Sequence, residues 1–240
     1  MTTLVTVRES IIACERCVRL RKYCTAIAKT KRAAYRDETY WGKPVPGFGD
    51  PNARIVLIGL APAAHGANRT GRNFTGDGKG GSGDFLMAAL HANGLANQTT
   101  SRHRDDGLQL HDAWIMAVAR CAPPANKPTP REIANCHSHL RDELDALPNV
   151  RVYVALGRIA FDACWKLLAD RHKARLQAVG RWPTRRPAFE HGASYRLPGA
   201  PTIVAAYHPS RQNTHTGRLT STMLRQAFRR AKAEADALNS

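Results

Sequence analysis

Four short segments of the chain are apolar at nearly every position, with little alternation between apolar and polar residues. Continuous apolar runs of this length are typical of strands that are buried on both faces of a parallel sheet. The predicted strands cover residues 53–60, 112–118, 150–156 and 202–207. Between and after them, apolar residues recur at helical spacing. The predicted helices cover residues 82–93, 130–147, 158–170 and 220–238.

The helix expected at 130–147 has the clearest start. Thr129 precedes Pro130, and Glu132 stands three residues after Thr129. This is the spacing of a capping box, with proline at the first helical position. Strands that alternate with helices predict an α/β fold with a parallel sheet and right-handed crossovers. Because no repeat or long linker divides the chain, we expect a single domain over residues 1–240.

The charge of the chain narrows the choice of partners. Its 240 residues include 36 Lys and Arg against 19 Asp and Glu, which gives a formal net charge of +17 and an isoelectric point near 10.3. A strongly basic folded domain attracts polyanions, and nucleic acid is the partner that we favour. The alternative is that the charge only keeps the protein in solution. The composition also excludes disordered, collagen-like and coiled-coil chains.

Membrane and secretion signals are missing from the sequence pattern. No apolar run approaches the roughly 18 residues of a membrane-spanning helix. The first residues are briefly apolar and then basic, without the apolar core of a signal peptide. We therefore expect a cytoplasmic protein with no membrane partner.

The chain contains six cysteines, which a cytoplasmic protein keeps reduced. Cys14 and Cys17 form a CxxC pair, and Cys121 and Cys136 are available as a second pair. The two pairs could converge on one site of four thiolates, which would bind zinc or an iron–sulfur cluster. Cys24 competes for a ligand position. Since four cysteines leave no open coordination position, we expect a structural site that pins the N-terminal segment to the domain.

The ends of the predicted strands indicate where a ligand would bind, because ligands of such sheets bind beyond the carboxyl ends of the strands. The first strand leads into a long glycine-rich loop. It is not a P-loop, because residue 73 is Asn and residue 80 is Gly. In this loop Phe74 could stack on a base or pack locally, and Asp77 could be a catalytic carboxylate or a helix cap.

The last strand ends at His208, which Pro209 follows. This histidine could be a rigid polar group that faces the crevice, or it could be structural. The basic, polar loop after it would suit contacts with phosphates.

These features together resemble the uracil-DNA glycosylase superfamily, most closely its family 5, the iron–sulfur type. The resemblance runs from residue 14 to residue 220. The segments that carry it are the CxxC at 14–17, GLAPAAHGANRTGRNFTGD at 59–77, RCAPPANKPTP at 120–130 with Cys136, ALGRIAF at 155–161 and YHPSRQNTHTGRLT at 207–220. It implies a three-layer α/β domain with a central four-stranded parallel sheet flanked by helices.

The resemblance also implies a cofactor and an activity. The cofactor would be a 4Fe–4S cluster on Cys14, Cys17, Cys121 and Cys136. The activity would be excision of uracil, and of other deaminated bases such as hypoxanthine, from damaged double-stranded DNA. Hydrolysis of the N-glycosidic bond would leave an abasic site for base excision repair. We expect a monomeric, monofunctional enzyme that does not cleave the strand.

Residue by residue, the resemblance assigns roles in this reaction. Phe74 would stack on the flipped base, His208 would stabilise charge on the departing base, and Asp77 would aid the attack of water. Asn126 resembles an active-site asparagine, although it could be a simple turn residue. The residues expected to bind substrate are Gly59, Ala61, Ala63, Phe74, Ser210 and Arg211.

The sequence departs from related families in one motif. Leu60 and Ala63 are apolar where those families carry a residue that binds the attacking water. The alternative function is a non-catalytic iron–sulfur or zinc module that binds nucleic acid. That module would explain the charge and the cysteines, but it would leave Phe74, Asp77 and His208 without a role.

Overall fold

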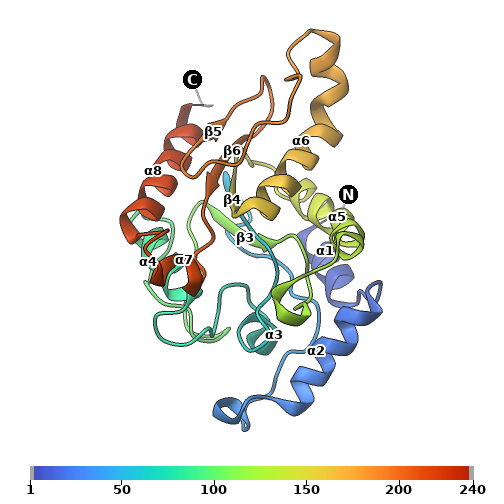
Figure 1. Cartoon of the computed structure of the whole chain (residues 1–240), viewed down its shortest axis with the longest axis vertical. Coiled ribbons are helices and arrows are strands. Elements are labelled where there is room, and N and C mark those ends of the chain that lie inside the picture. Colours follow the sequence, from blue (N-terminus) through green and yellow to red (C-terminus); the bar gives the residue numbers. More distant parts are fainter. Residues whose placement is uncertain (1–2, 238–240) are drawn as a thin grey trace.

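A six-stranded sheet lies at the centre of the structure, a computed structural model that describes residues 3–237 (Figure 1). Its four central strands are parallel, in the order β3-β2-β4-β6. They are β2 (Ile55–Gly59), β3 (Ala113–Ala117), β4 (Val152–Leu156) and β6 (Thr202–Ala206), and every residue in them is buried. The predicted parallel sheet is therefore confirmed, with strand ends that differ from the prediction by one or two residues.

Two short strands at the sheet edges were not predicted. β1 (Phe48–Gly49) pairs antiparallel with β3, and β5 (Ser194–Tyr195) pairs antiparallel with β6. Each has only two residues, which is too few to give a hydrophobic pattern. The chain passes from β2 to β3 on one side and then to β4 on the other side of β2. Such a reversal opens a crevice at the carboxyl ends of the central strands.

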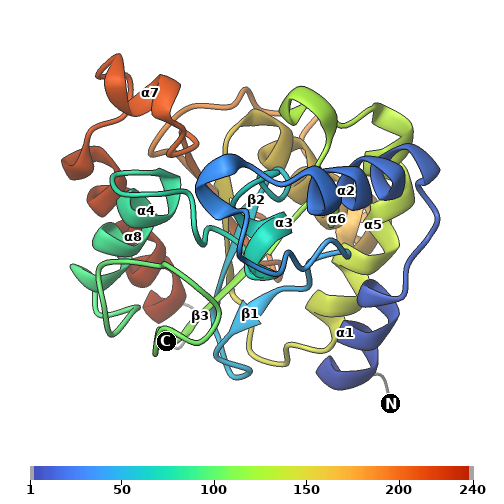
Figure 2. The same ribbon diagram turned by 90° about the horizontal axis from the view of Figure 1, so that it is seen from below.

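Helices cover both faces of the sheet, so the fold has three layers (Figure 2). On one face α4 (Ser82–His91) and α8 (Ser221–Ala237) bury Leu86, Leu90, Leu224 and Phe228 against the strands. On the other face α5 (Pro130–Asp145) and α6 (Arg158–Ala178) bury Leu140, Leu144, Phe161 and Leu168. The three-layer α/β architecture expected from the sequence is confirmed.

The helix boundaries follow the predictions, with one difference. The capping box forms at the start of α5: the Thr129 hydroxyl accepts from the Glu132 N–H at 3.2 Å, and the Glu132 carboxylate accepts from the Thr129 N–H at 2.7 Å. α6 continues to Ala178, although the pattern predicted an end at residue 170. In its last two turns only Leu176 is buried, so helix-forming residues extend the helix without an apolar face. The predicted end of the last helix, at residue 238, lies outside the described residues.

The N-terminal segment forms two helices that were not predicted. α1 (Leu4–Ile12) packs against α5, and α2 (Val18–Thr30) lies at the bottom of the molecule in the view of Figure 1. The Nε and Nη2 atoms of Arg19 donate to the two oxygens of the Glu132 carboxylate, at 2.8 and 2.7 Å. An ion pair therefore ties this segment to α5.

Short helices occupy the loops around the crevice: η1 (Ala33–Tyr35), α3 (Ala67–Thr70), η2 (Pro124–Asn126) and α7 (Arg211–His215). The last three follow β2, β3 and β6, respectively. Within residues 3–237, no helix combines the length and the apolarity needed to cross a membrane.

Candidate active site

A cavity of about 740 Å³ opens at the carboxyl ends of β2, β3 and β6. Its walls come from the loops that follow these strands and from the segment after α2. Every residue that the sequence nominated for catalysis or substrate binding lines this cavity: Gly59, Ala61, Ala63, Phe74, Asp77, Asn126, His208, Ser210 and Arg211. The structure thus brings together residues that are up to 152 positions apart in the sequence (211 − 59 = 152).

Phe74 is held in a position that depends on two glycines. Its φ of 51° is in the left-handed region, which bulky residues rarely adopt. A Cβ on Gly59 would lie 3.0 Å from the Phe74 ring, and a Cβ on Gly83 would lie 2.3 Å from the Phe74 carbonyl oxygen. The ring centroid lies 5.7 Å from that of His208, with 31° between the planes. Two tilted rings therefore form one wall of the cavity.

Asp77 is also fixed by close glycine contacts. A Cβ on Gly66 would lie 2.0 Å from its Oδ1 atom, and a Cβ on Gly81 would lie 2.7 Å from its Cβ. Burial raises the pKa of Asp77 to about 6, although the Gly83 N–H and the charge of Arg211 oppose this shift. Asp77 is therefore mostly ionised at neutral pH. Gly83 lies in the first turn of α4, so the Asp77 carboxylate accepts a hydrogen bond from the start of this helix. The same residue lines the cavity.

His208 follows β6 in a rigid turn. Its carbonyl oxygen accepts hydrogen bonds from the Ser210 N–H and the Asn213 side-chain amide, both at 2.8 Å. The Ser210 hydroxyl caps α7 by accepting from the Asn213 N–H. Burial lowers the pKa of His208 to about 4, so its ring is neutral at pH 7. A neutral imidazole carries one N–H donor and one acceptor nitrogen.

Asn126 and Arg211 approach the cavity from two other loops. Ala125 and Asn126 have φ values of 53° and 57°, which turn the backbone sharply in η2. The Asn126 side chain is exposed and makes no hydrogen bond within residues 3–237. The Arg211 guanidinium donates to the Asp77 carbonyl oxygen at 3.3 Å, which links α7 to the glycine-rich loop.

Several residues of this cavity were not singled out from the sequence. Arg32 and Tyr35, from the segment after α2, form part of its wall. His65 also lines it, and its Nδ1 atom lies 3.0 Å from the Tyr40 hydroxyl. The place of His65 within the segment 59–77 could have identified it. No local pattern links Arg32 or Tyr35 to the site.

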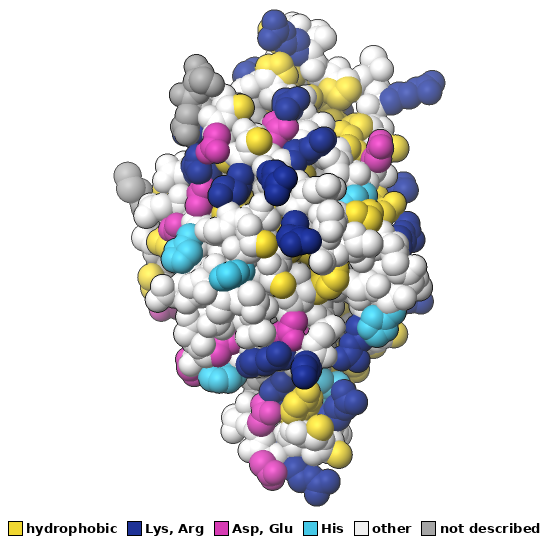
Figure 3. All heavy atoms as spheres, turned by 90° about the vertical axis from the view of Figure 1, so that its left-hand side faces the viewer, with side chains coloured by type: hydrophobic (Ala, Val, Ile, Leu, Met, Phe, Trp, Pro, Cys, Tyr) yellow, Lys and Arg dark blue, Asp and Glu magenta, His cyan; other side chains and the backbone are white. Residues whose placement is uncertain are grey.

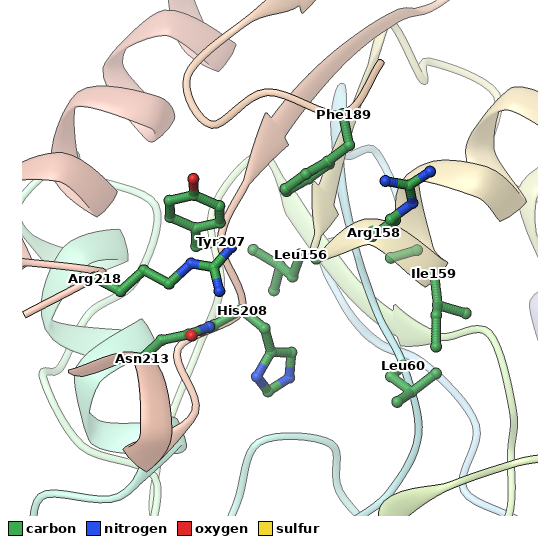
Figure 4. A pocket seen from close by; sticks show the side chains of 11 residues that line it. Leu60, Leu156, Arg158, Ile159, Phe189, Tyr207, His208, Asn213 and Arg218 are labelled. Carbon is green, nitrogen blue, oxygen red and sulfur yellow. The ribbon is translucent and has the colours of Figure 1, made fainter. Parts of the chain in front are cut away.

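A second pocket of about 460 Å³ lies beside His208, at the ends of β4 and β6. Figure 4 shows Arg158 and Arg218 on opposite sides of this pocket, with the apolar side chain of Leu156 between them. The Arg218 guanidinium carbon lies 4.7 Å from the centroid of the Tyr207 ring. Leu60 and His208 line both pockets, so the two are adjacent. Arg158 directly follows a predicted strand and its glycine, a signal that could have identified it.

The four cysteines of the two predicted pairs lie near one another. Burial raises the pKa of the Cys136 thiol, and the nearby Cys14 and Cys17 raise it further. A hydrogen bond with Cys24 and burial raise the pKa of Cys121, to which Cys136 also contributes. The thiols therefore share one electrostatic environment, formed by the turn between α1 and α2, the loop after β3, and α5.

The surroundings of these sulfurs suit thiolates. Arg16 Nε donates to Cys14 Sγ at 3.3 Å, and Asn135 Nδ2 donates to Cys17 Sγ at 3.5 Å. Hydrogen bonds to ligand sulfurs are typical of iron–sulfur sites. In the part of the chain from residue 3 to 237, no three metal-binding side chains are close enough to hold a single ion. The donors to Cys14 and Cys17 are therefore the features of this structure that suit thiolate ligands.

Two further cysteines complete the count. Cys24 is buried, and its thiol donates to the Ala122 carbonyl oxygen at 3.5 Å and contacts Cys121. It remains the alternative ligand beside the other four. Cys164 is fully buried in the core between α6 and the sheet, as expected for an apolar cysteine.

Comparisons with known proteins agree with this geometry. The family model of the Uracil DNA glycosylase superfamily matches residues 46–232. The Type-5 uracil-DNA glycosylase of Thermus thermophilus is 50% identical over 93% of this chain and 94% of its own length. That of Mycobacterium tuberculosis is 44% identical over 92% of this chain and 78% of its own length. The Type-4 uracil-DNA glycosylase of Archaeoglobus fulgidus is 30% identical over 69% and 70%. The chain therefore belongs to the uracil DNA glycosylase superfamily and, within it, to the type-5 group.

Proposed function

We propose that this protein is a monofunctional uracil-DNA glycosylase, which hydrolyses the N-glycosidic bond of a flipped uracil and leaves an abasic site. The observation that carries the proposal is the convergence of Phe74, Asp77, Asn126 and His208 on one cavity, from the segments that follow three different strands. A base must leave the stack before an enzyme can act on its glycosidic bond. The Phe74 ring would stack on the extruded base, and the free amide of Asn126 would bind its polar edge.

His208 and Asp77 would divide the chemistry between them. As the bond to the base breaks, its electron pair moves onto the base, and positive charge develops on the sugar. The neutral His208 ring would donate an N–H to the base oxygen on which negative charge accumulates. The ionised Asp77 would stabilise the sugar cation and accept a proton from the attacking water. A carboxylate with a pKa of about 6 suits a general base near neutral pH.

Double-stranded DNA is the proposed partner. The net charge of +17 favours a polyanion, and Figure 3 shows Lys and Arg side chains spread over the face that carries α4, α7 and α8. Arg158 and Arg218, beside the candidate active site, would contact phosphates next to the flipped nucleotide. We further propose that the enzyme acts as a cytoplasmic monomer with one domain, and that it also accepts hypoxanthine.

A 4Fe–4S cluster on Cys14, Cys17, Cys121 and Cys136 is the proposed cofactor. When bound, it would serve as a structural cross-link that joins the N-terminal segment to the loop after β3 and to α5. Because all four ligand positions would be filled by cysteines, the cluster would take no part in the hydrolysis. The support is the proximity of these thiols and the donors on Cys14 and Cys17.

One assay tests the proposed activity. A duplex with a single uracil is incubated with the protein and then treated with hot alkali, which cleaves abasic sites. We expect cleavage at the uracil position only after alkali, because the enzyme itself should not cut the strand. Strand breaks without alkali would contradict the monofunctional mechanism. Binding of the duplex without any alkali-labile product would support the alternative, a non-catalytic nucleic-acid-binding module.

A further inference from the structure

The sulfurs proposed to hold the cluster are surrounded by arginines. Arg16 donates to Cys14 at 3.3 Å, and the backbone N–H of Arg120 bonds to Cys136. Arg21 interacts with Cys121 through a hydrogen bond and through its charge. With Asn135 on Cys17, each of the four cysteines has a donor of its own.

Arg16 is held in place by contacts with α5. Its Nη1 atom donates to the Asn135 carbonyl oxygen at 2.9 Å and to the Ser138 hydroxyl at 2.8 Å. Its Nη2 atom contacts the ring of His139. The remaining nitrogen, Nε, faces Cys14. Arg16 forms no ion pair with a carboxylate in the described chain, so its charge is directed at the cysteines and α5.

Arg120 is the most unusual member of the set, because it is only 1% exposed. Its Nη2 atom pairs with the Glu143 carboxylate at 2.6 Å and reaches the His139 carbonyl oxygen at 3.4 Å. Glu143 also accepts from the Gly47 N–H at 2.8 Å. The Nε and Nη1 atoms of Arg120 have no hydrogen-bond partner within residues 3–237. Glu143 compensates the buried charge of Arg120, but buried nitrogens without an acceptor remain costly.

Arg21 belongs to α2. It is anchored to the Gly42 carbonyl oxygen at 3.0 Å and to the Glu15 carboxylate at 3.1 Å, and its side chain is 12% exposed. Three cations from three different segments are therefore positioned around one group of thiols. Among the described residues, Arg120 pairs with the Glu143 carboxylate and Arg21 with the Glu15 carboxylate. Glu15 is exposed.

We propose that Arg16, Arg21 and Arg120 form a cationic shell that stabilises the reduced state of the cluster and so raises its reduction potential. This inference rests on the proposed cofactor. Four thiolates outweigh the positive charge of the iron–sulfur core, and one-electron reduction makes the whole group more negative. Cations and hydrogen-bond donors around the sulfurs stabilise the more negative state preferentially.

The test measures the midpoint potential of the iron-loaded protein in an anaerobic titration with redox mediators, followed by absorbance. Arg16→Gln removes the charge at an exposed position, where folding should be preserved. We expect the equilibrium constant for reduction to fall about tenfold, which corresponds to about 59 mV for one electron. Arg16→Lys should restore most of the difference. The matched control is Arg225→Gln, an exposed arginine of α8 whose side chain contacts Thr222.

Each outcome decides the proposal. An unchanged potential in Arg16→Gln that retains its iron would overturn it. If Arg16→Gln loses its iron, the midpoint potential of Arg21→Gln decides the proposal: a lower potential than that of the wild type supports it, and an unchanged potential overturns it. A wild-type protein without iron would reject the cofactor and this inference together, whereas the uracil assay would still decide the enzymatic activity.

Discussion

Burial changes the protonation of two cavity residues in opposite directions. It raises the pKa of Asp77 to about 6 and lowers that of His208 to about 4. Above pH 6 the carboxylate is therefore charged while the imidazole is neutral. These are the two states that the proposed reaction needs, because the aspartate must accept a proton and the histidine must donate an uncharged N–H hydrogen bond.

The rate of uracil excision should consequently depend on pH through Asp77. We expect the single-turnover rate to rise with pH up to about 6 and then level off, because only the ionised carboxylate can act as a base. His208 should add no limb above about pH 5, since it is already neutral there. Asp77→Asn keeps an oxygen acceptor for the Gly83 N–H, so it should fold normally. It should lose most of the activity, and its remaining rate should no longer rise with pH up to about 6. An active Asp77→Asn enzyme would show that the aspartate only organises the loop.

Replacement of His208 tests the donor directly. His208→Ala should slow excision by roughly 10²–10³-fold, the usual loss for one preorganised donor. Affinity for duplex DNA should change little, because most of it comes from phosphate contacts elsewhere. Rates under single-turnover conditions and binding isotherms on the same duplex measure the two effects separately. A parallel loss of affinity would indicate that His208 mainly shapes the cavity.

At the scale of elements, the glycine-rich loop positions the site by close backbone approach. Gly66 precedes α3, and the space that a side chain would need there is taken by the Asp77 carboxylate, 2.0 Å from the Cβ position. The loop therefore needs glycine at particular positions because a side chain there would collide with a neighbouring residue. Backbone flexibility is not the reason for glycine at these positions.

Gly66→Ala should displace Asp77 and slow excision by roughly 10²-fold, the effect of a misplacement of about 1 Å. The matched comparison is the same substitution in the Asp77→Asn background. If Gly66 acts through Asp77, the second substitution should add little, whereas independent effects would multiply. Circular dichroism and thermal unfolding of all three variants would exclude global misfolding.

The elements around the cysteines allow a similar comparison. Cys136 lies in α5 and Cys164 in α6, and both are buried, with 5% and 0% exposure. Cys136→Ala should lose iron and colour and unfold at a lower temperature, because the link to the N-terminal segment is lost. Cys164→Ala should create a small cavity but keep its iron. Equal iron content in the two variants, measured by metal analysis, would remove Cys136 from the ligand set.

At the scale of the whole molecule, the excess positive charge should dominate binding to undamaged DNA. Counterion release makes such binding fall steeply with salt, and each lost phosphate contact reduces the slope of log K against log salt by about 1. Arg158→Ala should show this reduction, since the side chain lines the pocket beside His208. Arg141→Ala is the matched control and should leave the slope unchanged, because this exposed arginine lies in α5, on the other side of the sheet, and pairs with Asp142. Binding that does not depend on salt would contradict the proposed interface.

The sequence alone was sufficient for the elements whose burial is local. Each central strand is buried on both faces, so its apolar residues are continuous and all four strands were predicted. The start of α5 was predicted because Thr129 and Glu132 bond within one turn. The family and its motif residues also followed from the sequence, because short segments around the cavity carry a distinctive order of residues.

Only the tertiary structure decided the properties that depend on distant segments. The pKa values of Asp77 and His208 result from burial beneath loops that come from different strands, so neither residue type nor spacing could give them. The edge strands β1 and β5 form by pairing with β3 and β6, and their own residues carry no hydrophobic pattern that would predict a strand. Donors to the cysteines likewise come from distant segments: Asn135 and its partner Cys17 are 118 positions apart in the sequence. The pattern of apolar residues in a segment indicates which of its residues will be buried. Tertiary packing decides which segments contact one another, and the electrostatics of this site depend on those contacts.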